Sequence, residues 1–97
     1  MISARIHTRS GERLLAACDA ELLGMSFSEG EKRLNVSKIF YGGEEITEEQ
    51  LKERMKSVTV MNLVGERTVT VALASGYVSE EMVITVNGVK HAQAVMM

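Results

Sequence analysis

The chain has 97 residues, of which 45% are hydrophobic and 25% are charged, and its net charge is -2 at pH 7. This length allows one domain, residues 1–97, with a single hydrophobic core, and the composition excludes a disordered or membrane-embedded chain. The charge balance also excludes the broad positive field of a nonspecific nucleic-acid binder and leaves room only for local basic patches.

The opening residues, MISARIHTRSGER, contain no apolar run of signal-peptide length, and no stretch approaches the ~18 apolar residues of a membrane span. We therefore expect a cytoplasmic protein without a membrane segment. A single cysteine excludes an internal disulfide, and with only two histidines it cannot form an ordinary structural zinc site. Metalloprotease, Walker and dinucleotide-binding motifs are absent, so the sequence predicts neither a metal nor a cofactor.

The first predicted element is a strand in which apolar and polar residues alternate. Its apolar positions are Ile2, Ala4 and Ile6, and its polar positions are Ser3, Arg5, His7 and Arg9. This period of two predicts a half-buried strand with a basic outer face. Ser10-Gly11 predicts a tight turn into an interior strand over residues 13–19 (RLLAACD), which gives an antiparallel hairpin. A two-residue loop pairs Ser3 with Cys18 and Arg5 with Ala16.

A second hairpin is predicted from the alternation at residues 23–27, a turn at residues 28–30 and a strand that carries Leu34 and Val36. Gly24 is then a bulge. Ser37 is expected to cap a short helical turn over residues 38–41, and Gly42 to close this turn in the left-handed conformation.

Two adjacent glycines, Gly42 and Gly43, stand between an aromatic pair and a run of acids in FYGGEEITEEQ. Four nearby glutamates would repel a phosphate, so the glycines are interpreted as a bend before a helix. The helix begins at a capping box, Thr47 to Gln50. Phe40 and Tyr41 beside the acids are also a candidate site for a basic peptide or a divalent ion, against the commoner interpretation of a solvated helix start.

The remaining elements are a strand over residues 58–63, an ambiguous segment at residues 66–75 and a C-terminal hairpin. The ambiguous segment is β-branched and alternating, but its apolar spacing before Gly76 favours a helix. Asn87-Gly88 predicts a type I′ turn between strands at residues 83–86 and 89–95. Together, these elements predict an α+β domain of about six mostly antiparallel strands and two helices.

Cys18 is the candidate for chemistry. The predicted register places its thiol on the same face as Arg5 and His7, whose charge would favour the thiolate, and His91 is a candidate base. The alternative is that Cys18 is a small buried hydrophobic residue, which is the commoner role of a lone cysteine in an apolar strand.

Two groups of polar residues are candidates for binding. Arg5, His7 and Arg9 form a basic cluster that can contact RNA phosphates, or that protects a solvated edge strand. His91 and Gln93 share a strand face beside Lys90, and they are either a recognition pair for a base or carboxyl group or simply surface. The apolar C-terminus, residues 94–97, either closes the core or packs against a second copy of the chain.

Four stretches stand out together: residues 18–24 (CDAELLG), 40–44 (FYGGE), 62–66 (NLVGE) and 91–93 (HAQ), with Phe27, Glu29, Gly30, Gly76, Gly88 and Val89. In these residues the chain resembles a family of small archaeal proteins, domain of unknown function 424. The family pattern has proline at the position of Lys90. The resemblance implies an archaeal cytosolic protein, a helix after Gly65, and an association with RNA or translation, but no established activity.

These observations lead to three hypotheses. The first is a non-enzymatic module that binds RNA or a translation-associated protein through Arg5, His7 and Arg9, joined by Lys90, His91 and Gln93 if the two hairpins lie side by side. The second is a small enzyme that uses Cys18 and His91, which requires these groups to lie within about 3–4 Å of each other. The third is a structural homodimer joined through the C-terminus.

Overall fold

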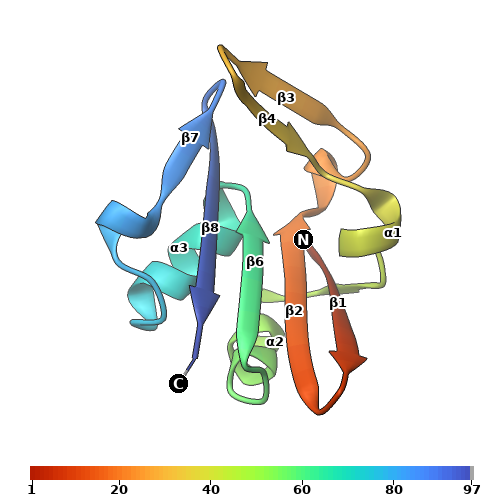
Figure 1. Cartoon of the computed structure of the whole chain (residues 1–97). Coiled ribbons are helices and arrows are strands. Elements are labelled where there is room, and N and C mark those ends of the chain that lie inside the picture. The colour runs from red at the N-terminus through yellow and green to blue at the C-terminus, as the bar shows by residue number, and fades with distance from the viewer. Residues whose placement is uncertain (97) are drawn as a thin grey trace.

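A six-stranded sheet forms the centre of the computed structural model, which describes residues 1–96 (Figure 1). The described elements are β1 (Ile2–Arg9), β2 (Glu12–Asp19), β3 (Ser26–Glu29), β4 (Lys32–Asn35), α1 (Lys38–Tyr41), β5 (Glu44–Ile46), α2 (Glu48–Met55), β6 (Val60–Val64), α3 (Glu66–Ala74), β7 (Ile84–Val86) and β8 (Val89–Val95). Two 3-10 turns, Ala20–Leu22 and Glu80–Met82, lie between them. The predicted α+β class with mostly antiparallel strands is confirmed.

The strand order of the sheet is β5-β1-β2-β6-β8-β7, and β3 and β4 form a separate two-stranded hairpin. Every pair is antiparallel except β2 and β6, which are parallel. A parallel pair cannot be joined by a tight turn, so the chain between these strands makes a long excursion through β3, β4, α1, β5 and α2. The first and last hairpins of the chain therefore lie on opposite sides of β6.

Both predicted tight turns have the expected conformation. Ser10 and Gly11 have φ of 52° and 82°, and Asn87 and Gly88 have φ of 50° and 83°. Positive φ at both central residues defines the type I′ turn, whose twist matches that of the flanking strands. The predicted pairing of Ser3 with Cys18 is confirmed, and so is that of Arg5 with Ala16.

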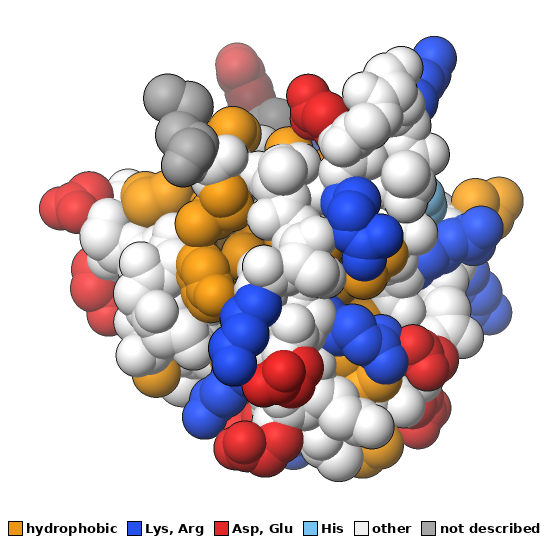
Figure 2. Space-filling model, turned by 90° about the horizontal axis from the view of Figure 1, so that it is seen from below, with side chains coloured by type: hydrophobic (Ala, Val, Ile, Leu, Met, Phe, Trp, Pro, Cys, Tyr) orange, Lys and Arg blue, Asp and Glu red, His pale blue; other side chains and the backbone are white. Residues whose placement is uncertain are grey.

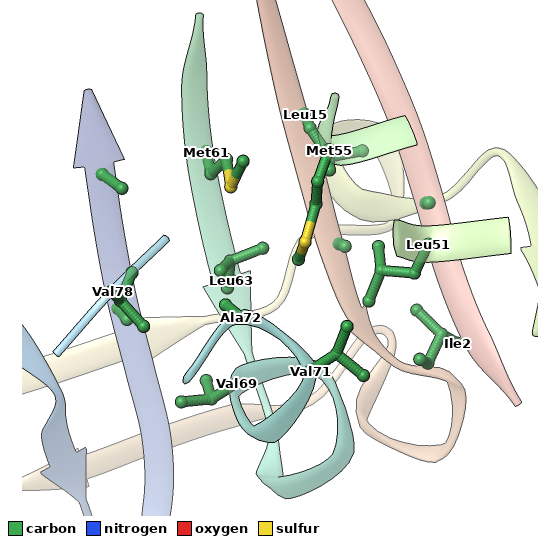
Figure 3. Packing of buried hydrophobic residues seen from close by; sticks show 14 of the residues in the cluster. Ile2, Leu15, Leu51, Met55, Met61, Leu63, Val69, Val71, Ala72 and Val78 are labelled. Atoms are coloured by element: carbon green, nitrogen blue, oxygen red, sulfur yellow. The ribbon is translucent and has the colours of Figure 1, made fainter. Parts of the chain in front are cut away.

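Helices α2 and α3 cover one face of the sheet and enclose the main core. Figure 3 shows Leu51 and Met55 of α2 and Val69 and Ala72 of α3 packed over sheet residues such as Leu63. The capping box of Thr47 and Gln50 is present, which confirms the predicted start of α2. The ambiguous segment after Gly65 is helical because its apolar positions face this core.

The opposite face of the sheet is covered only in part. Hairpin β3–β4 and helix α1 cover one end of it, over a second cluster that includes Cys18, Leu34, Tyr41, Val64 and Val86. Figure 1 shows the hairpin running across the end of the sheet opposite the β1–β2 turn, from the side of α1 toward β7. The remainder of this face is open to solvent.

Three local expectations were wrong. Gly42 has φ of -82° rather than a left-handed conformation, and it is needed because a Cβ there would collide with the carbonyl oxygen of Lys38. Gly24 does turn the chain with φ of 88°, but β3 begins after it, at Ser26. The segment after Gly43 was not predicted to be a strand, yet β5 pairs with β1 there and buries Ile46.

Candidate binding face of the sheet

The open face is defined here as the solvent-exposed part of the sheet surface opposite α2 and α3. One row across it carries polar side chains from β1, β6 and β8, with the small buried Ala16 of β2 between them. Arg5 lies opposite Ala16, Ala16 lies opposite Asn62, and Asn62 lies opposite Gln93. Adjacent strands are about 4.8 Å apart, so this row from β1 to β8 spans about 14 Å. The neighbouring row, from His7 to Val95, contains the half-buried Leu14 and Val60.

The β1 side of the open face is basic and partly held in place. Arg5 donates from Nη1 to the carbonyl oxygen of Ile39 (3.0 Å). His7 stacks on the ring of Phe40, with 4.9 Å between centroids and 17° between planes, and its Nε2 lies 2.8 Å from the Phe40 carbonyl oxygen. Because a carbonyl only accepts, Nε2 carries a proton and donates this bond.

Tyr41 of α1 packs on the covered part of the same sheet face and reaches the middle of the open face. It is 4% exposed, and its hydroxyl donates to Oδ1 of Asn62 at 2.6 Å. Burial, the larger cause, and the electrostatic interaction with Cys18 raise the pKa of Tyr41 to about 12, so this hydroxyl keeps its proton. This bond fixes the orientation of the Asn62 amide, whose NH₂ group is a donor for a ligand. Phe40 is the half-buried member of the aromatic pair, so Phe40 rather than Tyr41 presents a ring near the surface.

The β8 side of the open face carries His91 and Gln93, as predicted. His91 Nδ1 donates to the Leu63 carbonyl oxygen at 3.0 Å, and Gln93 Nε2 lies 3.4 Å from His91 Nε2. The ring therefore has its proton on Nδ1 and accepts at Nε2. Lys90 is not part of this group: it lies on the helix-bearing face, with Nζ 3.1 Å from Glu66 Oε2. Arg9 is exposed at the end of β1, opposite Glu12.

A family model described as a protein of unknown function (DUF424) matches residues 7–97. The chain belongs to this family. The resemblance found in FYGGE and HAQ is thereby confirmed, and the match covers every open-face residue except Arg5.

The fold of this DUF424 protein is similar to that of a solved structure, an uncharacterized conserved protein from Methanopyrus kandleri. The TM-score is 0.82, with 24% sequence identity over 99% of this chain and 93% of that chain. At this identity the likeness shows the fold alone. No curated protein matches the chain significantly.

Cys18 of this DUF424 protein is buried beneath Tyr41 and hairpin β3–β4. Desolvation, with smaller contributions from the nearby charges of Asp19 and Glu21, raises the pKa of its thiol to about 12, so the expectation that Arg5 and His7 favour the thiolate is wrong. Cys18 lies opposite Val64, which lies opposite His91. Two strand spacings, about 10 Å, therefore separate the backbones of Cys18 and His91, and the structure does not bring the two together.

Asp19 has a role that its sequence context did not predict. This carboxylate is 4% exposed and accepts from Arg67 N (3.1 Å), Thr68 N (2.9 Å) and Thr68 Oγ1 (2.8 Å) at the start of α3. Gly65, with φ of 107°, passes so close that a Cβ would collide with the carboxylate. The only signal in the sequence was that the sole aspartate ends an apolar strand. Its contacts are those of a structural cap.

Two further findings concern the described residues. No group of three or more His, Cys, Asp or Glu side chains within residues 1–96 is placed to hold a metal ion. In the same range, no helix is long and apolar enough to cross a membrane.

Proposed function

We propose that this DUF424 protein is a non-enzymatic binding module that engages single-stranded RNA through the open face of its sheet. The observation that carries the proposal is the row of Arg5, Asn62 and Gln93 across the sheet, next to the His7–Phe40 stack. The proposal includes the setting that the family resemblance implies, which is the archaeal cytoplasm and the translation apparatus with its RNA and protein partners.

The chemistry of the row suits a nucleotide strand. Single-stranded RNA is recognised on open sheets by stacking of bases on aromatic rings and by hydrogen bonds to base edges, with about two or three bases per sheet. Asn62 offers an amide donor, His91 and Gln93 offer polar groups for a base edge, and Phe40 offers a ring. Within residues 1–96 neither Arg5 nor Arg9 forms an ion pair, so both remain available for phosphates.

Fluorescence anisotropy of a labelled decauridylate, measured between 50 and 300 mM salt, tests the proposal. Two or three phosphate contacts on a single strand give a slope of about -1.4 to -2.1 in a plot of log K against log salt. Charge reversal by Arg5→Glu with Arg9→Glu should abolish binding, whereas Gln93→Ala should weaken it several-fold without changing the slope, because Gln93 contacts a base rather than a phosphate.

The matched control is Lys52→Glu with Lys56→Glu, the same charge change on α2 and its C-cap at the other side of the sheet. Equal loss of binding in the control would show that only net charge matters. The proposal would be ruled out if RNA affinity did not change with salt concentration, or if binding persisted after charge reversal at Arg5 and Arg9.

A structural homodimer is the second candidate because the C-terminal strand is incompletely covered. Val95 is 69% exposed, and Ile84 and Met82 near the same sheet edge are also exposed. Met97 lies outside the described residues. Light scattering at micromolar to millimolar concentration should report twice the monomer mass if two copies pair, and Val95→Lys should return the mass to that of a monomer.

A further inference from the structure

The outer edge of β1 is only partly paired. Strand β5 pairs with Ile2, Ser3 and Ala4 and goes no further along β1. Because Arg9 and Glu12 close a two-residue turn, the odd-numbered residues of β1 point their backbone groups at β2, and the even-numbered ones point outward. The backbone N–H and C=O groups of Ile6 and Thr8 therefore face outward, and no strand within residues 1–96 pairs with them.

An open hollow of about 440 Å³ lies against this edge. Three arginines from three different elements line it: Arg5 from β1, Arg13 from β2 and Arg54 from α2, with Glu44 as the one acid. Figure 2 looks at the end of the molecule that carries the β1–β2 turn, and it shows Lys and Arg side chains gathered in the middle of this end.

Each of these arginines keeps unused hydrogen-bond donors. Arg13 donates from Nε to the Ser57 carbonyl oxygen (2.8 Å), Arg5 donates through one nitrogen to Ile39, and Arg54 Nη1 lies 2.6 Å from Glu44 Oε1. A guanidinium has five N–H groups, so each of the three arginines can donate hydrogen bonds to a further carboxylate.

We propose that this edge is a docking site for an acidic, extended polypeptide segment that adds to β1 as a further strand. Unpaired N–H and C=O groups at strand spacing match the backbone of another strand, whereas a nucleic acid has no such repeat, so the edge favours a polypeptide. Successive residues of an added strand point to opposite faces of the sheet. One acid then meets Arg13 and Arg54 on the helix side, and the next acid meets Arg5 on the open face.

The protein already contains one copy of this interaction. Strand β5 pairs with the edge of β1, and its Glu44, opposite Ala4, forms an ion pair with Arg54 of α2. An acidic residue on a strand beside β1 is therefore already bound by one of the three arginines. The incoming segment extends the same pattern by a few residues along β1. The ligand chemistry is therefore two or more consecutive Asp or Glu residues within an extended segment.

The probe is a fluorescein-labelled octapeptide of valine and threonine with two consecutive central glutamates, and its control has two glutamines in their place. The acidic peptide should bind with a Kd on the order of 10–100 μM, and the glutamine peptide at least tenfold more weakly. Arg13→Gln and Arg54→Gln should each weaken binding of the acidic peptide about threefold, because each removes one partly exposed charge partner.

Thr8→Pro tests strand addition itself. It removes an outward N–H without breaking the ladder to β2, so it should weaken peptide binding about tenfold, whereas the matched Thr8→Ala keeps the N–H and should bind normally. If Thr8→Pro does not fold, amide hydrogen exchange of the parent chain gives the same information: the peptide should slow exchange at Ile6 and Thr8.

Absence of binding at 1 mM acidic peptide, or equal binding of both peptides, would overturn the proposal. The proposal would also be overturned if the Arg13→Gln and Arg54→Gln variants bound decauridylate more weakly but bound the peptide as well as the parent chain does. In that case these arginines would bind RNA rather than an acidic peptide. Gln93→Ala separates the two proposals: it should reduce RNA binding on the open face and leave peptide binding unchanged.

Discussion

The carboxylate of Asp19 holds the start of α3, and its removal gives a stability change that can be worked out from the structure. Asp19→Ala leaves three donors without a partner: the backbone N–H groups of Arg67 and Thr68 and the Thr68 hydroxyl. At about 1 kcal/mol for each bond, with a fraction more for the helix dipole, the expected loss is about 3 kcal/mol of unfolding free energy.

Asp19→Asn is the sharper comparison. Both Thr68 donors reach Oδ1, which asparagine retains, whereas the Arg67 N–H reaches Oδ2, which becomes an NH₂ group. The expected loss is therefore smaller, about 1.5 kcal/mol, from one lost bond and the lost charge. Thr68→Val, which removes only the hydroxyl, should cost about 1 kcal/mol.

Urea unfolding followed by circular dichroism measures these changes. With an m-value of about 1.5 kcal/mol/M, Asp19→Ala should lower the midpoint by about 2 M and leave the slope unchanged. A loss below about 1 kcal/mol, or an Asp19→Asn variant as unstable as Asp19→Ala, would refute the assignment of the carboxylate as the cap of α3.

Three other outcomes are expected. Gly65→Ala should lower the unfolding free energy by at least about 2 kcal/mol, because a φ of 107° is strained for alanine and the added Cβ meets the Asp19 carboxylate. This loss should be smaller in an Asp19→Ala background, which a double-mutant cycle of urea midpoints measures. Thr47→Ala should cost about 1 kcal/mol through loss of the capping box, and Thr47→Ser should cost little, in the same assay. The folded chain holds the pKa of Cys18 at about 12 against an ordinary 9.0, so unfolding releases a proton between these values. Stability should thus be complete below pH 9 and fall as pH rises toward 12, by about 1.4 kcal/mol per pH unit for this thiol. Tyr41 adds a parallel fall, and Cys18→Ala should make the profile shallower; an unchanged profile in this variant would show that the thiol is not held protonated by the fold.

The hairpins could be predicted from sequence because their signals are local. Asn87-Gly88 and Ser10-Gly11 supply the positive φ values that a two-residue turn needs, and the alternation beside each turn fixes which side chains face the core. The same parity places His91 and Gln93 together and Lys90 on the other face. Thr47 and Gln50 are likewise three residues apart, so the capping box can be recognised without any tertiary information.

Contacts between distant segments could not be predicted in this way. Asp19 and Thr68 are 49 positions apart, and nothing near Asp19 indicates that a helix will begin above it. The environment of Cys18 depends on a hairpin and a tyrosine that return from later in the chain, and these desolvate the thiol despite the arginine on the neighbouring strand. Strand β5 is three residues long and carries two glutamates, so it has neither the length nor the alternation that identifies a strand.

The parallel pairing of β2 with β6 has a consequence for how the chain folds. On one side of this parallel pair, β1 leads directly into β2 through a tight turn, and on the other side β7 leads directly into β8. The parallel pair itself brings together residues that are distant in the sequence, such as Arg13 and Thr59, which are 46 positions apart. Its closure requires the intervening segment to be gathered into a loop, at an entropic cost that local turns do not incur. Substitutions along β6 should therefore slow refolding more than substitutions in either hairpin turn.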